Sequence, residues 1–161
     1  DRLYVEKIND AVELYTQIAG VEANPVHDLA AFAQDLPDDG GSTKALMIFD
    51  EVEAEKWEKR LQEMYAGQLE VVRSKPYFLE LMAPGVSKGE ALRQLAASLG
   101  IEREQVMAIG DSYNDISMLK YAGLGVAVEN APDIVRKVAD ASVGSNNAGG
   151  VAEALHKFAL R

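Results

Sequence analysis

The chain has 161 residues, 48% hydrophobic and 26% charged, a composition that suits one globular domain or two small ones. Its formal net charge is −10, and the 26 acidic side chains are spread along the chain, which argues against nucleic-acid binding because that requires clustered cations. It has no cysteine, which excludes disulfides and thiolate chemistry, and no apolar run near the roughly 20 residues of a membrane span, so we expect a cytoplasmic protein without membrane contacts.

Short strand and helix signals alternate in the first half of the chain. Val52, Trp57, Leu61 and Tyr65 recur at roughly helical spacing, and two strand-like runs joined at Lys75-Pro76 predict an antiparallel hairpin. This half therefore has the character of an α+β domain. Its predicted elements are a strand at 3–8, a helix at 9–20, a strand at 42–50, a helix at 51–67, and strands at 69–74 and 77–83.

From Pro84 onward the pattern changes to alternating helices and strands. The first helix, 86–100, opens with a capping box of Ser87 and Glu90, and it carries Leu95 and Leu99 on one face. Continuous apolar strands alternating with helices predict a doubly wound parallel sheet covered on both faces. We expect one domain at 1–83 and a second at 84–161. The further elements are strands at 105–110, 123–128 and 141–144, and helices at 114–123, 131–140 and 150–160.

Two carboxylates and an amide follow the strand at 105–110, in the stretch GDSYND. Asp111 comes directly after the strand, where ligands bind in open α/β sheets, and Asp115 lies four residues later, so one helical turn can return it to the same side. Together with the Asn114 amide, these groups suit a hard cation such as Mg²⁺ bound with a phosphate. The alternative interpretation is structural, because Asp is common as a helix cap at such turns.

Lys88 is a second candidate, because it begins a helix where the helix dipole disfavours a cation. A lysine at this position is explained if its ammonium group reaches a bound anion. The alternative is an ordinary solvated surface lysine.

These residues together resemble a known family. The helix with Lys88, GDSYND at 110–115, AGLGVAVENA at 122–131 and GVAEAL at 150–155 are similar to the C-terminal half of haloacid dehalogenase-superfamily phosphatases of the Cof-like branch. The likeness covers residues 70–161 well, while 1–69 resemble the mixed α/β cap of that branch more loosely. It implies the C-terminal part of a Rossmann-like parallel sheet plus most of an α+β (C2-type) cap domain.

The resemblance also implies roles and a reaction. Asp111 would bind Mg²⁺, Asp115 would support the metal directly or through water, and Lys88 and Asn114 would hold the phosphate, with Lys88 and Asp111 as catalytic residues. The family hydrolyses phosphate monoesters through an aspartyl-phosphate, so the expected substrate is a small phosphorylated metabolite resembling a sugar phosphate. Substrate choice in the family depends on the cap, where Arg73 is a candidate.

The family's nucleophile motif, DxDGT after an apolar strand, is not evident here. The stretch DDGGST at 38–43 follows no apolar strand, and Asp50 follows one but has Val52 where the second Asp belongs. We interpret the first as a polar turn and Asp50 as a helix cap. Asp50 could alternatively be the phosphoacceptor of a signalling domain.

In the resembled family the nucleophile precedes the cap, and this chain opens inside the apparent cap. We therefore expect the nucleophile segment to lie upstream of Asp1, together with the central strand that would pair with 105–110. The chain alone should then expose a strand edge, self-associate or bind that segment, and lack phosphatase activity. A non-catalytic module that binds a phosphorylated ligand is the alternative function.

Overall fold

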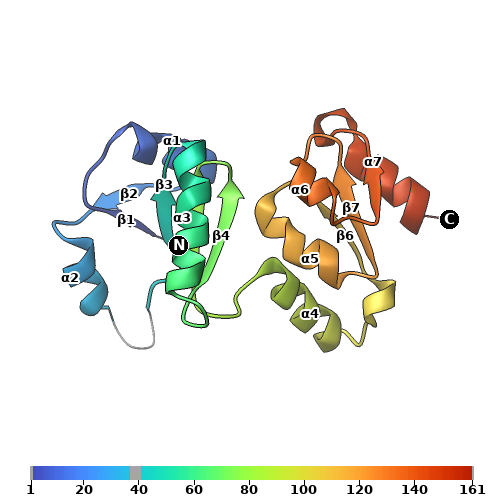
Figure 1. The fold of residues 1–161 in the computed structure, drawn as a ribbon, viewed down its shortest axis with the longest axis horizontal. Coiled ribbons are helices and arrows are strands. Elements are labelled where there is room, and N and C mark those ends of the chain that lie inside the picture. Colours follow the sequence, from blue (N-terminus) through green and yellow to red (C-terminus); the bar gives the residue numbers. More distant parts are fainter. Residues whose placement is uncertain (1, 37–40, 161) are drawn as a thin grey trace. The chain divides into compact units, whose positions relative to one another are not determined.

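The computed structural model describes residues 2–36 and 41–160, and it divides the chain into two compact units, 1–43 and 44–161. The first unit contains a parallel pair of short strands and two helices (Figure 1). Its elements are β1 (Leu3–Val5), α1 (Asp10–Ala19), β2 (Ala23–Pro25) and α2 (Leu29–Gln34).

Helix α1 confirms the helix predicted at 9–20. The Asn9 side chain accepts a hydrogen bond from Val12 N at 3.0 Å, and Gly20 ends the helix in the left-handed conformation, at φ 66°. Strand β1 is shorter than the predicted 3–8, because it pairs with β2 over only three residues. Strand β2 and helix α2 were not predicted.

The second unit begins with an antiparallel sheet in the order β3-β5-β4, with one helix, α3, packed against β4 and β5. Leu61 of α3 is buried against Val71 and Leu79 of the sheet. The predicted hairpin at 69–83 is confirmed. The elements are β3 (Ala45–Ile48), α3 (Glu51–Met64), β4 (Glu70–Lys75) and β5 (Phe78–Met82).

A parallel sheet in the order β6-β7-β8 follows, as the continuous apolar runs predicted. Helices α4 and α5 pack on each other, α5 packs on β7, and α7 packs on β7 and β8. The predicted closing helix is α7 followed by a wider turn over 155–159. The elements are α4 (Lys88–Ser98), β6 (Met107–Gly110), α5 (Ile116–Tyr121), β7 (Leu124–Val128), α6 (Asp133–Arg136), β8 (Ala141–Val143) and α7 (Gly150–Ala154).

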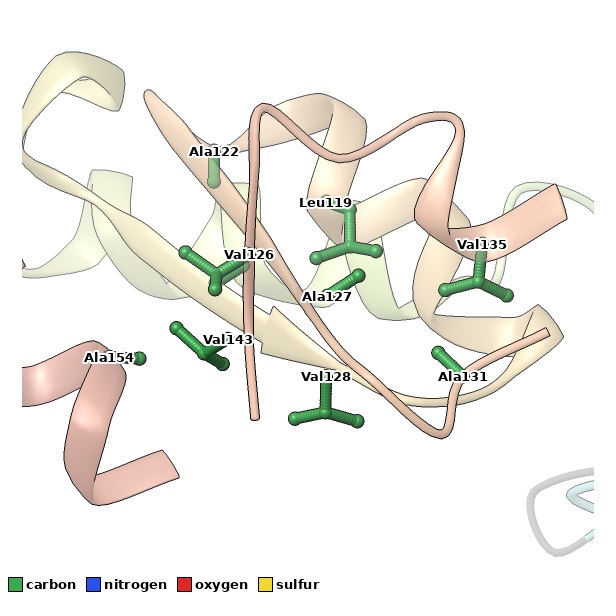
Figure 2. Close-up of a cluster of buried hydrophobic side chains, with 10 residues drawn as sticks. Leu119, Ala122, Val126, Ala127, Val128, Ala131, Val135, Val143 and Ala154 are labelled. Carbon is green, nitrogen blue, oxygen red and sulfur yellow. The ribbon is translucent and has the colours of Figure 1, made fainter. Parts of the chain in front are cut away.

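The main core surrounds β7, whose last four residues are buried (Figure 2). Val126 and Val128 point to one face of the sheet and Ala127 to the other, since successive strand residues alternate. Leu119 of α5 and Ala154 of α7 belong to the same buried cluster. Helices thus cover both faces of the strand, and this rigid sheet positions the loops at its carboxyl edge.

Strand β6 forms an edge of this sheet in the described part of the chain, where it pairs with β7. Helix α4 buries Gly89 and Ala96, whereas Leu95 and Leu99, which the pattern placed together on one face, are 55% and 63% exposed. The domain boundary predicted near Ala83 separates the antiparallel from the parallel sheet, but both sheets fall within unit 44–161, so that boundary stays a prediction.

Among the described residues, we find no helix with the length and apolar character needed to span a membrane.

Candidate functional site

The loop of residues 110–115 follows β6 at the carboxyl edge of the parallel sheet and is organised around Asp115. This residue is 2% exposed, and its Oδ2 accepts hydrogen bonds from the backbone N–H groups of Asp111 and Ser112, both at 2.9 Å. A Cβ at Gly110 would lie 2.6 Å from Asp115 Cβ, so only glycine leaves room for this approach. Asp115 therefore fixes the path of the loop from inside.

Lys88 meets this loop from the first turn of α4. Its Nζ donates to Asp115 Oδ1, and the lysine side chain stays 48% exposed. The contact spans 27 residues of sequence and depends on close packing of α4 on α5: Gly89 N donates to Ser117 Oγ at 3.0 Å, and a Cβ on Gly89 would lie 2.6 Å from Ser117 O. The structure thus brings Lys88 and Asp115 together, as a shared site requires.

Asp111 and Asn114 remain available to a ligand. The Asp111 side chain is exposed and accepts no hydrogen bond from the part of the chain that the structure describes. The Asn114 Oδ1 atom is buried and has no hydrogen-bond partner among those residues. Buried polar atoms are normally paired, so this one points to a missing donor or cation. The site therefore offers an open carboxylate, an accessible ammonium group and an unsatisfied amide oxygen.

The donor set fits a hard cation in part. Within residues 2–36 and 41–160, no group of three His, Cys, Asp or Glu side chains is gathered closely enough to hold a metal ion. Asp111 has a free carboxylate, whereas both oxygens of Asp115 are already engaged by Lys88 and two backbone N–H groups. Of these two carboxylates, only that of Asp111 is free of hydrogen bonds from the described residues, so it is the one that would be open to a hard cation.

A pocket of about 600 Å³ opens beside these residues, between β4 and the first turns of α4 and α5. Its volume is in the range of pockets for small molecules. The residues lining it include Lys88, Asn114, Tyr113, Arg73 and Lys120.

The sequence offered two stretches that partly resemble the nucleophile motif, one at Asp50 and one at 38–43. Asp50 is the N-cap of α3, because its Oδ1 accepts from Glu53 N at 2.9 Å, so the interpretation as a helix cap is confirmed. The stretch 38–43 lies partly outside the described residues. Sequence reasoning missed the parts played by Gly110 and Ser112, although the GD pair directly after a strand is a signal for close backbone approach.

Comparison with known proteins gives a consistent assignment. A family model described as haloacid dehalogenase-like hydrolase matches residues 2–155. The 5-amino-6-(5-phospho-D-ribitylamino)uracil phosphatase YcsE of Bacillus subtilis is 46% identical over 93 residues, which are 58% of this chain and 37% of that protein. Phosphatase YwpJ of the same organism is 37% identical over 141 residues, 88% of this chain and 48% of that protein.

The fold agrees with these sequence matches. A solved haloacid dehalogenase-like hydrolase from B. subtilis superposes with a TM-score of 0.81 at 28% identity, covering 98% of this chain and 62% of that one. The present chain thus has the family's architecture, a Rossmann-like core with a cap. It spans half or less of the length of the curated relatives named above.

Proposed function

The chain belongs to the haloacid dehalogenase-like hydrolase family, and we propose that it supplies the phosphate- and metal-binding part of a Mg²⁺-dependent phosphate-monoester hydrolase. The observation that carries this proposal is the arrangement around Asp115. One buried carboxylate orients the Lys88 ammonium and holds the backbone of Asp111, which leaves the Asp111 carboxylate open at the carboxyl edge of the sheet.

Each residue has a distinct role in this proposal. Lys88 and the side-chain NH₂ group of Asn114 donate to the phosphate oxygens, and Asp111 binds Mg²⁺. Asp115 acts on the metal site through Lys88 and the loop, since both of its oxygens are occupied. Bound Mg²⁺ would offset negative charge on the phosphoryl group during its transfer.

The proposed reaction proceeds through an aspartyl-phosphate. A carboxylate oxygen attacks phosphorus, the bond to the ester oxygen breaks, and the leaving alkoxide takes a proton; water then releases inorganic phosphate and restores the carboxylate. We place this nucleophile in a part of the protein outside these 161 residues, because the sequence contains no DxDGT motif and Asp50 caps α3. The 161-residue chain alone is therefore expected to be inactive.

The substrate we propose is a small phosphorylated metabolite resembling a sugar phosphate. Support comes from the pocket of about 600 Å³ beside Lys88 and from the phosphatase names of the two curated relatives. The phosphoribityl group in the name of the first relative belongs to that protein and indicates only the chemical class. A cytoplasmic location also stays a prediction.

Hydrolysis of p-nitrophenyl phosphate by the intact protein that contains this chain tests the proposal. Activity should require Mg²⁺ and disappear with EDTA, and Asp111→Asn and Lys88→Met should each lower kcat by roughly 10²–10³-fold, because both groups stabilise the transferring phosphoryl group. Two exposed residues of matched charge, Asp133 and Lys59, serve as controls in Asp133→Asn and Lys59→Met.

One result would overturn the metal part of this proposal, and another would overturn the hydrolase activity itself. Hydrolysis that persists in EDTA would exclude the metal role. Tight binding of inorganic phosphate without any turnover by the intact protein would instead establish the non-catalytic binding module.

A further inference from the structure

Arg73 of β4 is a buried cation that the phosphatase chemistry does not use. It is 8% exposed, and Glu58 of α3 holds it at two points: Glu58 Oε2 accepts from Arg73 Nε at 2.7 Å, and Oε1 accepts from Arg73 N at 3.2 Å. A carboxylate that binds both the side chain and the main chain of one residue leaves its guanidinium little freedom. The orientation of Arg73 is thus set from within the antiparallel sheet and its helix.

The fixed guanidinium stacks on the site loop. Arg73 Cζ lies 4.3 Å from the centroid of the Tyr113 ring, which is cation–π geometry. Tyr113 lies between Ser112, whose N–H binds Asp115, and Asn114, whose oxygen lacks a partner. Arg73 therefore contacts the loop within two residues of Asp111.

A second contact comes from the next residue of the same strand. The pairing register of β4 and β5 shifts between Arg73 and Lys75, which leaves Ser74 without a partner across the hairpin. The Ser74 carbonyl instead accepts a hydrogen bond from Ser112 Oγ at 2.6 Å. Such irregularities redirect backbone groups beside functional sites. Arg73 and Ser74 of β4 thus contact Tyr113 and Ser112 of the loop.

We propose that Arg73, held by Glu58, is a positioning residue that sets the Asp111–Asn114 loop through Tyr113, with the Ser74–Ser112 hydrogen bond as its companion contact. This inference rests on the proposed function for its catalytic consequence. Strand β4 would then help to place the groups that bind metal and phosphate. Displacement of such a loop by about an ångström is enough to slow catalysis.

The test uses the intact protein with p-nitrophenyl phosphate and MgCl₂. Arg73→Met and Tyr113→Leu should each lower kcat about tenfold and raise the Mg²⁺ concentration needed for half-maximal activity. The double variant should be no less active than either single variant, because both substitutions remove the same contact between Arg73 and Tyr113. Tyr113→Phe keeps the ring and should recover most of the activity lost in Tyr113→Leu. The control is Arg60→Met, because Arg60 lies 4.8 Å from the Trp57 ring centroid in a similar pair on α3.

Hydrogen exchange supplies a readout independent of activity. The N–H groups of Asp111 and Ser112 both bind Asp115, so mass spectrometry of the peptide 107–119 should show roughly tenfold faster exchange in Arg73→Met than in Arg60→Met. If the wild-type protein has no activity at all, the proposed function fails, and the exchange result still decides whether Arg73 positions the loop.

Two outcomes would overturn the positioning role. One is unchanged loop exchange in Arg73→Met. The other is a lower melting temperature in that variant with kcat and Mg²⁺ dependence both within twofold of wild type, which would make Arg73 a packing residue only.

Discussion

At the scale of single residues, Asp115 joins Lys88 to the backbone of Asp111 and Ser112. It is a buried carboxylate with a charged partner, Lys88, on one oxygen and two backbone N–H donors on the other. Hydrogen bonds to a charged group contribute more than neutral ones, and removal of a buried acceptor leaves its donors unpaired. The same atoms therefore support both the fold of the loop and the orientation of the lysine.

We predict that Asp115→Asn lowers the free energy of unfolding by about 1.5–3 kcal/mol, because the amide cannot accept at both positions and its NH₂ group faces the lysine. Urea unfolding of the intact protein measures this change. The control is Asp133→Asn, which removes an exposed pair with Arg136 and should cost much less, because exposed ion pairs contribute little. Equal losses in the two variants would contradict the role given to Asp115.

The sequence could predict which residues gather at the site but not how each is used. Lys88, Asp111, Asn114 and Asp115 were identified from strand ends, helix starts and family motifs. The contact between Lys88 and Asp115 Oδ1 depends on how closely α4 approaches α5, a packing distance that no local pattern encodes. The Glu58–Arg73 pair was missed for the same reason, since 15 residues separate its members.

At the scale of elements, the first turn of α4 determines where Lys88 points. Ser87 Oγ accepts from Glu90 N at 3.1 Å, which is half of the predicted capping box. The Glu90 carboxylate instead accepts from Arg93 and Gln94. These hydrogen bonds, that from Arg93 foremost, lower the pKa of Glu90 from its ordinary 4.5 to about 2.

This shift predicts a pH dependence. Because the folded pKa lies below the unfolded one, the stabilisation by Glu90 is complete above about pH 4.5 and is lost as the pH falls toward 2. The melting temperature of wild type should therefore exceed that of Glu90→Gln at pH 6, with a small difference because Glu90 is at the surface, and the two should converge near pH 2. A gap that is constant over this range would show that Glu90 does not titrate as the structure implies.

Elements with a clear apolar pattern were predictable, while β2 and α2 were not. Strands β6 and β7 were recognised because continuous apolar runs mark strands covered on both faces. The short β8 was recognised from its place in the alternation of helices and strands. Strand β2 has three residues and ends in Pro25, too few for any periodicity. Helix α2 has a usable signal, its N-cap Asp28, but its six residues fall short of a clear helical pattern.

At the scale of the whole chain, the parallel sheet has an open side. Strand β6 pairs with β7 and forms an edge within residues 2–36 and 41–160, and α4 exposes Leu95 and Leu99. An edge strand leaves the N–H and C=O groups on its outer side without a partner strand. Such edges promote association with another chain. The solved relative continues beyond the part matched here, since the chain covers 62% of it.

We therefore predict that the 161-residue chain, expressed by itself, associates with further copies at micromolar concentration. Light scattering should report a mass above that of one chain, and the mass should rise with protein concentration, because the open strand edge and the exposed leucines provide a surface that another chain can cover. The intact protein is the control, and at the same concentration it should associate less, since we expect its remaining segments to cover that edge. A concentration-independent monomer of the 161-residue chain would show that β6 is adequately protected as it stands, and the self-association predicted from the sequence would then be wrong.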